Sequence, residues 1–235
     1  MSVNKAAIFD LDGTLVDTLP GIAFALRQAL GELGVTPDPA FVVRAHIGGG
    51  SGNMLAAAAR HHGIGDTAAL SHRYHALYQT HCLHDTVCYA GVKELVVALK
   101  AQGVRLAVLT NKDDTLSNRI LQALFPPDTF EQVYGARADR PLKPDISGLQ
   151  QVMAALGTTS EQCLYVGDTS IDVQTANRAG VCVAYVTWGY GDADNLADWQ
   201  PNAVCHDVVQ LTTCLRQHLA WQESVSSCSR KDIHH

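Results

Sequence analysis

The sequence has no hydrophobic run long enough to span a membrane, no Cys-x-x-Cys pair and no excess of basic residues. A membrane-spanning helix needs about 20 apolar residues, and a signal peptide needs an apolar stretch behind its first positive charge; neither pattern is present. Lys and Arg number 17 against 23 Asp and Glu, which disfavours nucleic-acid binding as the main activity. The 7 cysteines are odd in number and indicate free thiols in a reducing compartment. We therefore expect a cytoplasmic protein.

Apolar residues are nevertheless abundant, at 47% of 235 residues, which suits one domain with a smaller insertion. Short apolar runs rich in branched side chains alternate with helical patterns, and this alternation is typical of a parallel sheet buried on both faces. The sequence therefore predicts an α/β fold with a Rossmann-like parallel sheet. The expected strands are residues 6–9, 104–109, 132–134, 163–166 and 181–186.

Residues 16–89 break this alternation, because they contain helical patterns and no convincing strand. We predict a small all-helical domain inserted after the first strand, here called the helical insertion. The α/β core would then consist of residues 1–15 and 90–223. Residues 224–235 are polar and Ser-rich, and we expect them to form a disordered tail.

Two carboxylates follow the first expected strand, in the segment Asp10-Leu11-Asp12-Gly13-Thr14. Gly13 allows a tight loop, so that both acids and nearby backbone groups can surround one point. Buried acids without a counter-charge are costly, and Mg²⁺ prefers oxygen ligands of this kind, so a divalent ion is expected there. A strand end followed by an ordinary Asp-Gly turn would leave the same pattern.

Two strands expected after the insertion also end at polar residues: Thr110 and Asn111 follow residues 104–109, and Asp168 and Asp172 follow residues 163–166. Lys143 lies between prolines in the segment before the second of these strands. The carboxyl ends of parallel strands meet at one edge of a sheet, where open α/β proteins bind ligands. Together these groups suggest a phosphate held against a divalent ion. Taken singly, each has an ordinary alternative: a helix cap for the two acids, a solvated loop for the lysine and a turn for Thr110 and Asn111.

The order of these groups resembles the four motifs of the haloacid dehalogenase-like hydrolase superfamily. Within it the chain looks most like the bacterial phosphoglycolate phosphatases, over about residues 3–220. The helical insertion resembles the cap that this superfamily carries after its first motif. The matching residues are Asp10-x-Asp12-Gly13-Thr14, Thr110-Asn111, Lys143-Pro144 and Gly167-Asp168-x-x-x-Asp172. Thr169 departs from the pattern, since Ser is more familiar after that Asp, but it keeps the hydroxyl.

The resemblance implies a Mg²⁺-dependent phosphatase that acts through an aspartyl-phosphate. Asp10 would be the nucleophile, and Asp12 would be the general acid and then the general base. The ion would be held by the Asp10 side chain, the Asp12 backbone carbonyl and Asp168, while Asp172 would act through a metal-bound water or by orienting Lys143.

The phosphate group would be bound by Lys143, by the Thr110 hydroxyl and by backbone amides such as that of Gly13. Asn111 would reach the phosphate or the other end of the substrate. In the helical insertion, the Gly-rich stretch that contains Gly48 exposes backbone amides to an anion, and Arg44 and His46 could read a carboxylate. The same stretch also fits a flexible helix connector.

Several other functions stay open. The resemblance implies 2-phosphoglycolate as substrate, but a sugar-phosphate phosphatase, a nucleotidase or a phosphomutase carries the same two acids. No Lys lies between Lys5 and Lys93, which disfavours the phosphonate-cleaving relatives that need a cap lysine. A signalling receiver module is a remote alternative. The histidines of the insertion favour a polar surface over a zinc site, which needs three or four converging ligands. The partner would be a small phosphorylated metabolite, and the protein a monomer or homodimer.

Overall fold

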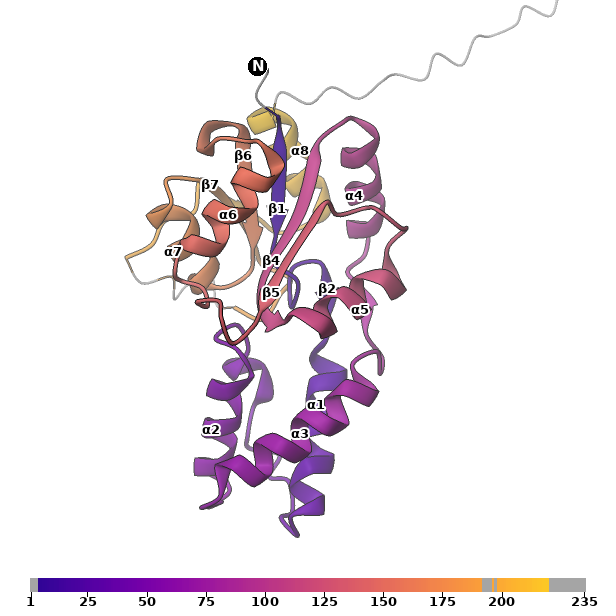
Figure 1. Ribbon diagram of the computed structural model, residues 1–235, viewed down its shortest axis with the longest axis vertical. Coiled ribbons are helices and arrows are strands. Elements are labelled where there is room, and N and C mark those ends of the chain that lie inside the picture. Colours follow the sequence, from indigo (N-terminus) through magenta and orange to yellow (C-terminus); the bar gives the residue numbers. More distant parts are fainter. Residues whose placement is uncertain (1–3, 192–195, 197, 220–235) are drawn as a thin grey trace, which may run out of the picture.

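The computed structural model describes residues 4–191, 196 and 198–219, and its centre is a six-stranded parallel sheet (Figure 1). The strand order is β5-β4-β1-β6-β7-β8, which places β1 between β4 and β6. The strands are β1 Ala6–Phe9, β4 Arg105–Asp113, β5 Gln132–Ala136, β6 Cys163–Gly167, β7 Cys182–Val186 and β8 Ala203–Cys205. All five predicted strands are present, and the α/β prediction is confirmed. β8 was not predicted, because three residues are too few to show a pattern.

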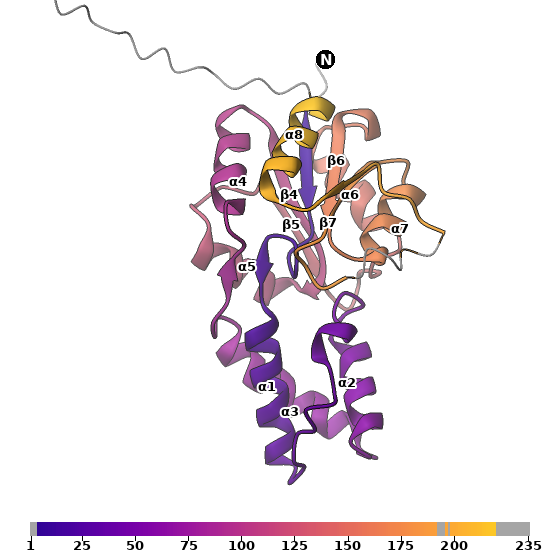
Figure 2. The ribbon, with the colours of Figure 1, turned by 180° about the vertical axis from the view of Figure 1, so that it is seen from behind.

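Helices cover both faces of the sheet, as the near-continuous apolar strands require. Helices α4 Val92–Ala101, α5 Asp114–Leu124 and α8 Val208–Leu219 pack on one face (Figure 2). Helices α6 Ser147–Leu156 and α7 Ser170–Arg178 cover the other (Figure 1). Along β1, Ala7 and Phe9 point into the first core and Ala6 and Ile8 into the second. This is the two-residue periodicity of a strand.

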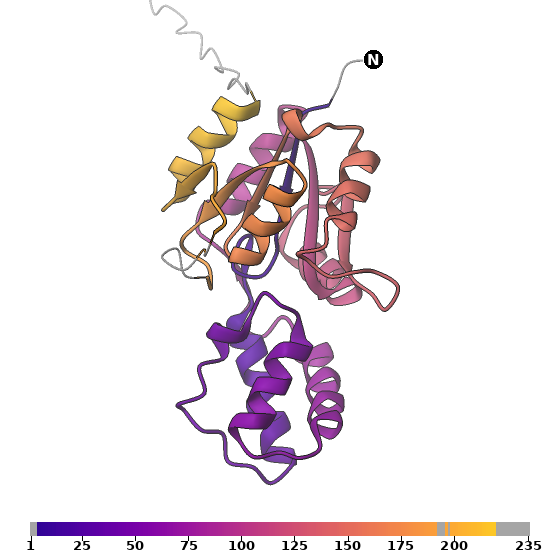
Figure 3. The same ribbon diagram turned by 90° about the vertical axis from the view of Figure 1, so that its left-hand side faces the viewer.

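The helical insertion contains α1 Leu19–Glu32, the short 3-10 helix η1 Val43–His46, α2 Ser51–His61 and α3 Thr67–His81. These helices lie together at one end of the molecule, beyond the sheet (Figure 3). Leu26 of α1 and Leu70 of α3 are buried in their common core. Two short antiparallel strands, β2 Val16–Asp17 and β3 Val87–Cys88, join the insertion to the sheet. They correct the expectation of no strand between residues 16 and 89, since two-residue strands carry no alternation.

β4 runs past the predicted range of residues 104–109, so Thr110 and Asn111 lie inside the strand and not after it. Its pairing with β5 shifts register between Leu109 and Asp113. Within the described ranges, no helix is long and apolar enough to cross a membrane. The predicted tail, residues 224–235, lies outside the described residues.

Candidate active site

Three buried carboxylates converge at the carboxyl edge of the sheet. Asp10 follows β1 directly, Asp168 follows β6, and Asp172 lies in the first turn of α7. Each offers an oxygen within 4.8 Å of the others, and their exposed fractions are 4%, 0% and 0%. Among the residues that the structure describes, this is the one group of three His, Cys, Asp or Glu side chains that converges so closely. It is called the acid cluster below.

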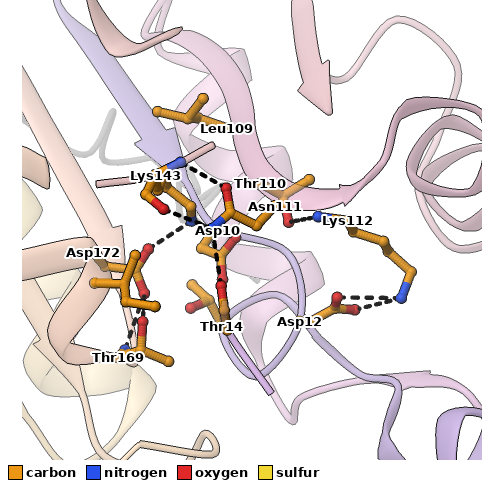
Figure 4. Close-up of polar contacts among 12 residues, drawn as sticks. Asp10, Asp12, Thr14, Leu109, Thr110, Asn111, Lys112, Lys143, Thr169 and Asp172 are labelled. Atoms are coloured by element: carbon orange, nitrogen blue, oxygen red, sulfur yellow. Dashed lines mark hydrogen bonds and ion pairs between the residues drawn. The ribbon is translucent and has the colours of Figure 1, made fainter. Parts of the chain in front are cut away.

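Lys143 supplies the positive charge of the acid cluster (Figure 4). Its Nζ lies 2.9 Å from Asp10 Oδ1, 2.7 Å from Asp172 Oδ1 and 3.0 Å from Tyr165 Oη. Although burial disfavours the ammonium, Asp10 and Asp172 raise the pKa of Lys143 well above its usual value. This ammonium therefore contacts two of the three acids in the cluster, Asp10 and Asp172.

Burial, together with the neighbouring negative charges, raises the pKa values of two of these acids. Burial raises the pKa of Asp10 to about 6, with Lys143 opposing the shift and Asp172 adding to it. Burial, with Asp172 and Asp10 nearby, raises the pKa of Asp168 well above its usual value. Carboxylate oxygens with a surplus of negative charge are the donor set that a hard divalent cation prefers. The residues present therefore fit Mg²⁺.

Asp168 is held by two hydrogen bonds and by a close backbone approach. The Thr14 hydroxyl donates to Oδ1 at 2.8 Å, and the Tyr190 amide donates to Oδ2 at 2.7 Å. Gly13, at φ +87°, passes so close that a Cβ there would lie 2.8 Å from Asp168 Cγ. The Gly13 amide donates to the Val16 carbonyl at 2.9 Å. The structure thus gives Gly13 a steric role, with its amide already used inside the loop.

Asp172 serves two functions at once. It forms a capping box at the start of α7, where its Oδ2 accepts hydrogen bonds from the Thr169 amide at 3.0 Å and hydroxyl at 2.6 Å. Its Oδ1 accepts from Lys143 and, at 3.1 Å, from Tyr165. The helix cap that the sequence offered as an ordinary alternative is therefore real, and it positions the lysine as well.

Asp12 lies apart from the acid cluster, although it lines the same cavity as Asp10 (Figure 4). Its Oδ1 accepts a hydrogen bond from the Thr18 hydroxyl at 2.6 Å. Its two oxygens lie 3.0 and 3.2 Å from the Nζ of Lys112, a residue that was not predicted as part of the site. The only signal for Lys112 in the sequence was its position after Thr110 and Asn111.

Asn111 fixes the loop that carries Lys143. Its Oδ1 accepts from the Lys143 amide at 2.8 Å, while its Nδ2 donates to the Lys143 and Gly48 carbonyls, both at 3.0 Å. Thr110 is buried and lines the cavity. Asn111 thus lines the cavity, but these bonds engage its side-chain amide in holding the core loop and contacting the insertion.

A cavity of about 620 Å³ lies between the sheet edge and the helical insertion. Asp10, Asp12 and Thr110 line it from the sheet, and Gly48 and Tyr78 line it from the insertion. Gly48 has φ +111°, and a Cβ there would lie 3.1 Å from Cγ2 of Thr169, so glycine permits this close approach to the core.

Arg44 does not line this cavity. Its guanidinium donates to the backbone carbonyls of Gly189 and Tyr190, on the loop that also holds Asp168. The structure therefore places Arg44 as a contact between the insertion and that loop, and not beside Asp10 or Asp12. Among the histidines of the insertion, His75 bonds Ser51 and Ser71, while His81 and His84 pack on Phe24.

Comparison with known proteins agrees with this geometry. Residues 7–186 match the family model described as haloacid dehalogenase-like hydrolase. The chain is 38% identical over 194 residues to a phosphoglycolate phosphatase of Rhodospirillum rubrum, covering 79% of this chain and 80% of the relative. It is 34% identical over 214 residues to a phosphoglycolate phosphatase of Pseudomonas savastanoi pv. phaseolicola, covering 88% and 78%.

A solved structure gives the same result. The crystal structure described as a predicted phosphoglycolate phosphatase from Haemophilus somnus superposes with a TM-score of 0.81 at 28% identity, covering 91% of this chain and 99% of that one. The sequence motifs, the six-stranded parallel sheet and these similarities agree. The chain belongs to the haloacid dehalogenase-like hydrolase family.

Proposed function

We propose that this hydrolase is a Mg²⁺-dependent phosphatase that cleaves a small phosphomonoester, 2-phosphoglycolate, through an aspartyl-phosphate on Asp10. The observation that carries the proposal is the Asp10 carboxylate, which lines the cavity while bonded to Lys143 beside two further acids. The names of the relatives support a phosphatase and point to this substrate.

In the first step, an oxygen of Asp10 attacks phosphorus and the ester P–O bond breaks. Two anions repel each other at this point, and Lys143 offsets part of that repulsion. Mg²⁺, when bound by Asp10, Asp168 and the Asp12 backbone carbonyl, would neutralise further charge on the transferring group. Asp172 keeps the Lys143 ammonium aimed at Asp10.

Asp12 moves the protons. It gives a proton to the departing alkoxide and then takes one from the water that attacks the aspartyl-phosphate. In this second step the water oxygen bonds to phosphorus and the P–O bond to Asp10 breaks, which releases phosphate, restores the Asp10 carboxylate and leaves Asp12 protonated again. The helical insertion closes the cavity over the leaving group and limits access of bulk water during the first step.

Phosphate release from a panel of small esters, with Mg²⁺ or with EDTA, tests this proposal. We expect release from 2-phosphoglycolate with Mg²⁺, none with EDTA, and none from D10N. The matched control is Glu94→Gln, an exposed carboxylate on α4, which should act like wild type. Product that keeps its phosphate would instead identify a phosphomutase, and full activity in D10N would refute the nucleophile.

A further inference from the structure

Lys112 places a second buried ammonium on the cavity wall, away from the acid cluster. The residue is 8% exposed and lies near the end of β4. Its Nζ lies 2.6 Å from the hydroxyl of Tyr78 and 4.6 Å from the centre of that ring. Tyr78 belongs to α3 of the helical insertion. The ammonium therefore sits where the sheet and the insertion meet.

The arrangement of the catalytic groups determines which part of a substrate reaches this ammonium. In the proposed reaction, phosphorus must contact Asp10 and the ester oxygen must contact Asp12. The rest of the leaving group then continues past Asp12, on the side away from Asp10. Lys112 is bonded to Asp12 at 3.0 Å on that side (Figure 4), so it faces atoms one or two bonds beyond the ester oxygen.

The chemistry of Lys112 favours a singly charged oxygen ligand. An ammonium carries three protons, and Lys112 directs them toward the two oxygens of Asp12, at 3.0 and 3.2 Å, and toward the Tyr78 hydroxyl. Lys112 also lines the cavity, so a ligand oxygen there would take the place of the longer of the two Asp12 contacts. One ammonium supplies one positive charge, so the position suits a singly charged carboxylate better than a second phosphate dianion. Of the two residues predicted to read a carboxylate, Arg44 does not line the cavity and His46 does, but among the described residues it is Lys112 that pairs with Asp12.

We propose that Lys112, held in place by Tyr78, binds the carboxylate of the substrate and so selects phosphorylated short hydroxy acids over uncharged esters. This inference rests on the proposed phosphatase function. Substrate selection would then depend on Lys112 of the core and on Tyr78 of the insertion, which holds its ammonium in place. The anion site would therefore form when the insertion is docked on the core.

The test compares two esters that differ in the charge at this position. 2-Phosphoglycolate carries the carboxylate, and 2-hydroxyethyl phosphate replaces it with an uncharged alcohol. The measured quantity is the ratio of their kcat/KM values, with Mg²⁺ present. A charge-assisted hydrogen bond accounts for about 10- to 100-fold of such a ratio. We expect K112M to lower the ratio by about this factor, mainly through a higher KM for 2-phosphoglycolate.

Three further variants separate binding from folding or positioning. K112R keeps the charge and should restore part of the ratio, whereas Y78F keeps the packing and should lower it by a few-fold. The control is Lys100→Met, which removes a partly exposed lysine on α4, remote in sequence from the site and paired with Glu131 at 3.4 Å, and should leave the ratio unchanged.

A ratio that stays constant in K112M and Y78F, with both esters slowed equally, would overturn the carboxylate site and leave Lys112 as a residue that positions Asp12. Equal kcat/KM values for both esters in the wild type would overturn the carboxylate site and leave the phosphatase intact. No phosphate release from either ester would overturn both proposals.

Discussion

Replacement of Asp10 by Asn should stabilise the metal-free protein while abolishing its activity. Asp10 is buried among other acids, and its pKa rises from 3.8 to about 6. A pKa that is higher in the folded state means that ionisation of Asp10 opposes folding. The contribution of protonated Asp10 to the free energy of unfolding is fully present below pH 3.8 and is lost as the pH rises through about 6. Asn has nearly the same shape and no charge, so D10N escapes this loss.

The size of the effect follows from the shift of about two pKa units, at about 1.4 kcal/mol per unit. At pH 7.5 the gain is about 3 kcal/mol, and at pH 5, where Asp10 is only partly ionised, it is about 1.6 kcal/mol. For a chain of this length, about 3 kcal/mol corresponds to a rise in Tm of about 6–12 °C. The amide oxygen of Asn can still accept from Lys143, so the local contact is retained.

Urea unfolding in EDTA at pH 7.5 and at pH 5 measures the gap in the free energy of unfolding between D10N and wild type. We expect D10N to be more stable than wild type at both values, with a gap that shrinks by about half at pH 5. Mg²⁺ should stabilise the wild type more than D10N, because it binds the ionised cluster. The reasoning fails if D10N is no more stable than wild type in EDTA at pH 7.5, or if the gap widens at pH 5.

Three further predictions concern the same site. Lys143→Met should abolish phosphate release and lower the free energy of unfolding by about 3–5 kcal/mol, because Asp10 and Asp172 lose their buried cation; unchanged urea unfolding would contradict this. Gly13→Ala should weaken Mg²⁺ binding and destabilise the protein by more than about 1 kcal/mol, since its Cβ would meet Asp168 at positive φ, and calorimetric titration checks it. Mg²⁺ affinity should fall as the pH drops through about 6, where Asp10 gains a proton, and equal affinity at pH 5.5 and 7.5 would count against it.

The acid cluster was predictable from the sequence because its geometry depends on short-range rules. Asp10 and Asp168 each follow a buried strand directly, and parallel strands align their carboxyl ends. Gly13 marks the tight loop that follows Asp12, and the proline after Lys143 marks the loop before α6. These signals lie within a few residues of the groups they place, so the sequence carries them.

The cavity wall was not predictable in the same way. Whether Lys112 faces the cavity depends on the irregular pairing of β4 with β5, which apolar periodicity does not reveal. Arg44 lies in a segment that reads equally well as a substrate loop or a connector. Its actual contacts with Gly189 and Tyr190 depend on how the insertion docks on the sheet, which is a tertiary property.

The central claim is that the phosphoryl group passes through Asp10. Rapid acid quenching during turnover of 2-phosphoglycolate with Mg²⁺, followed by peptide mass spectrometry, tests it most directly. We expect one phosphoryl group on the peptide that contains Asp10, removable by hydroxylamine and absent from D10N. Turnover by D10N at the wild-type rate, with no phosphorylated peptide in either protein, would show that water attacks the ester directly and would contradict the account.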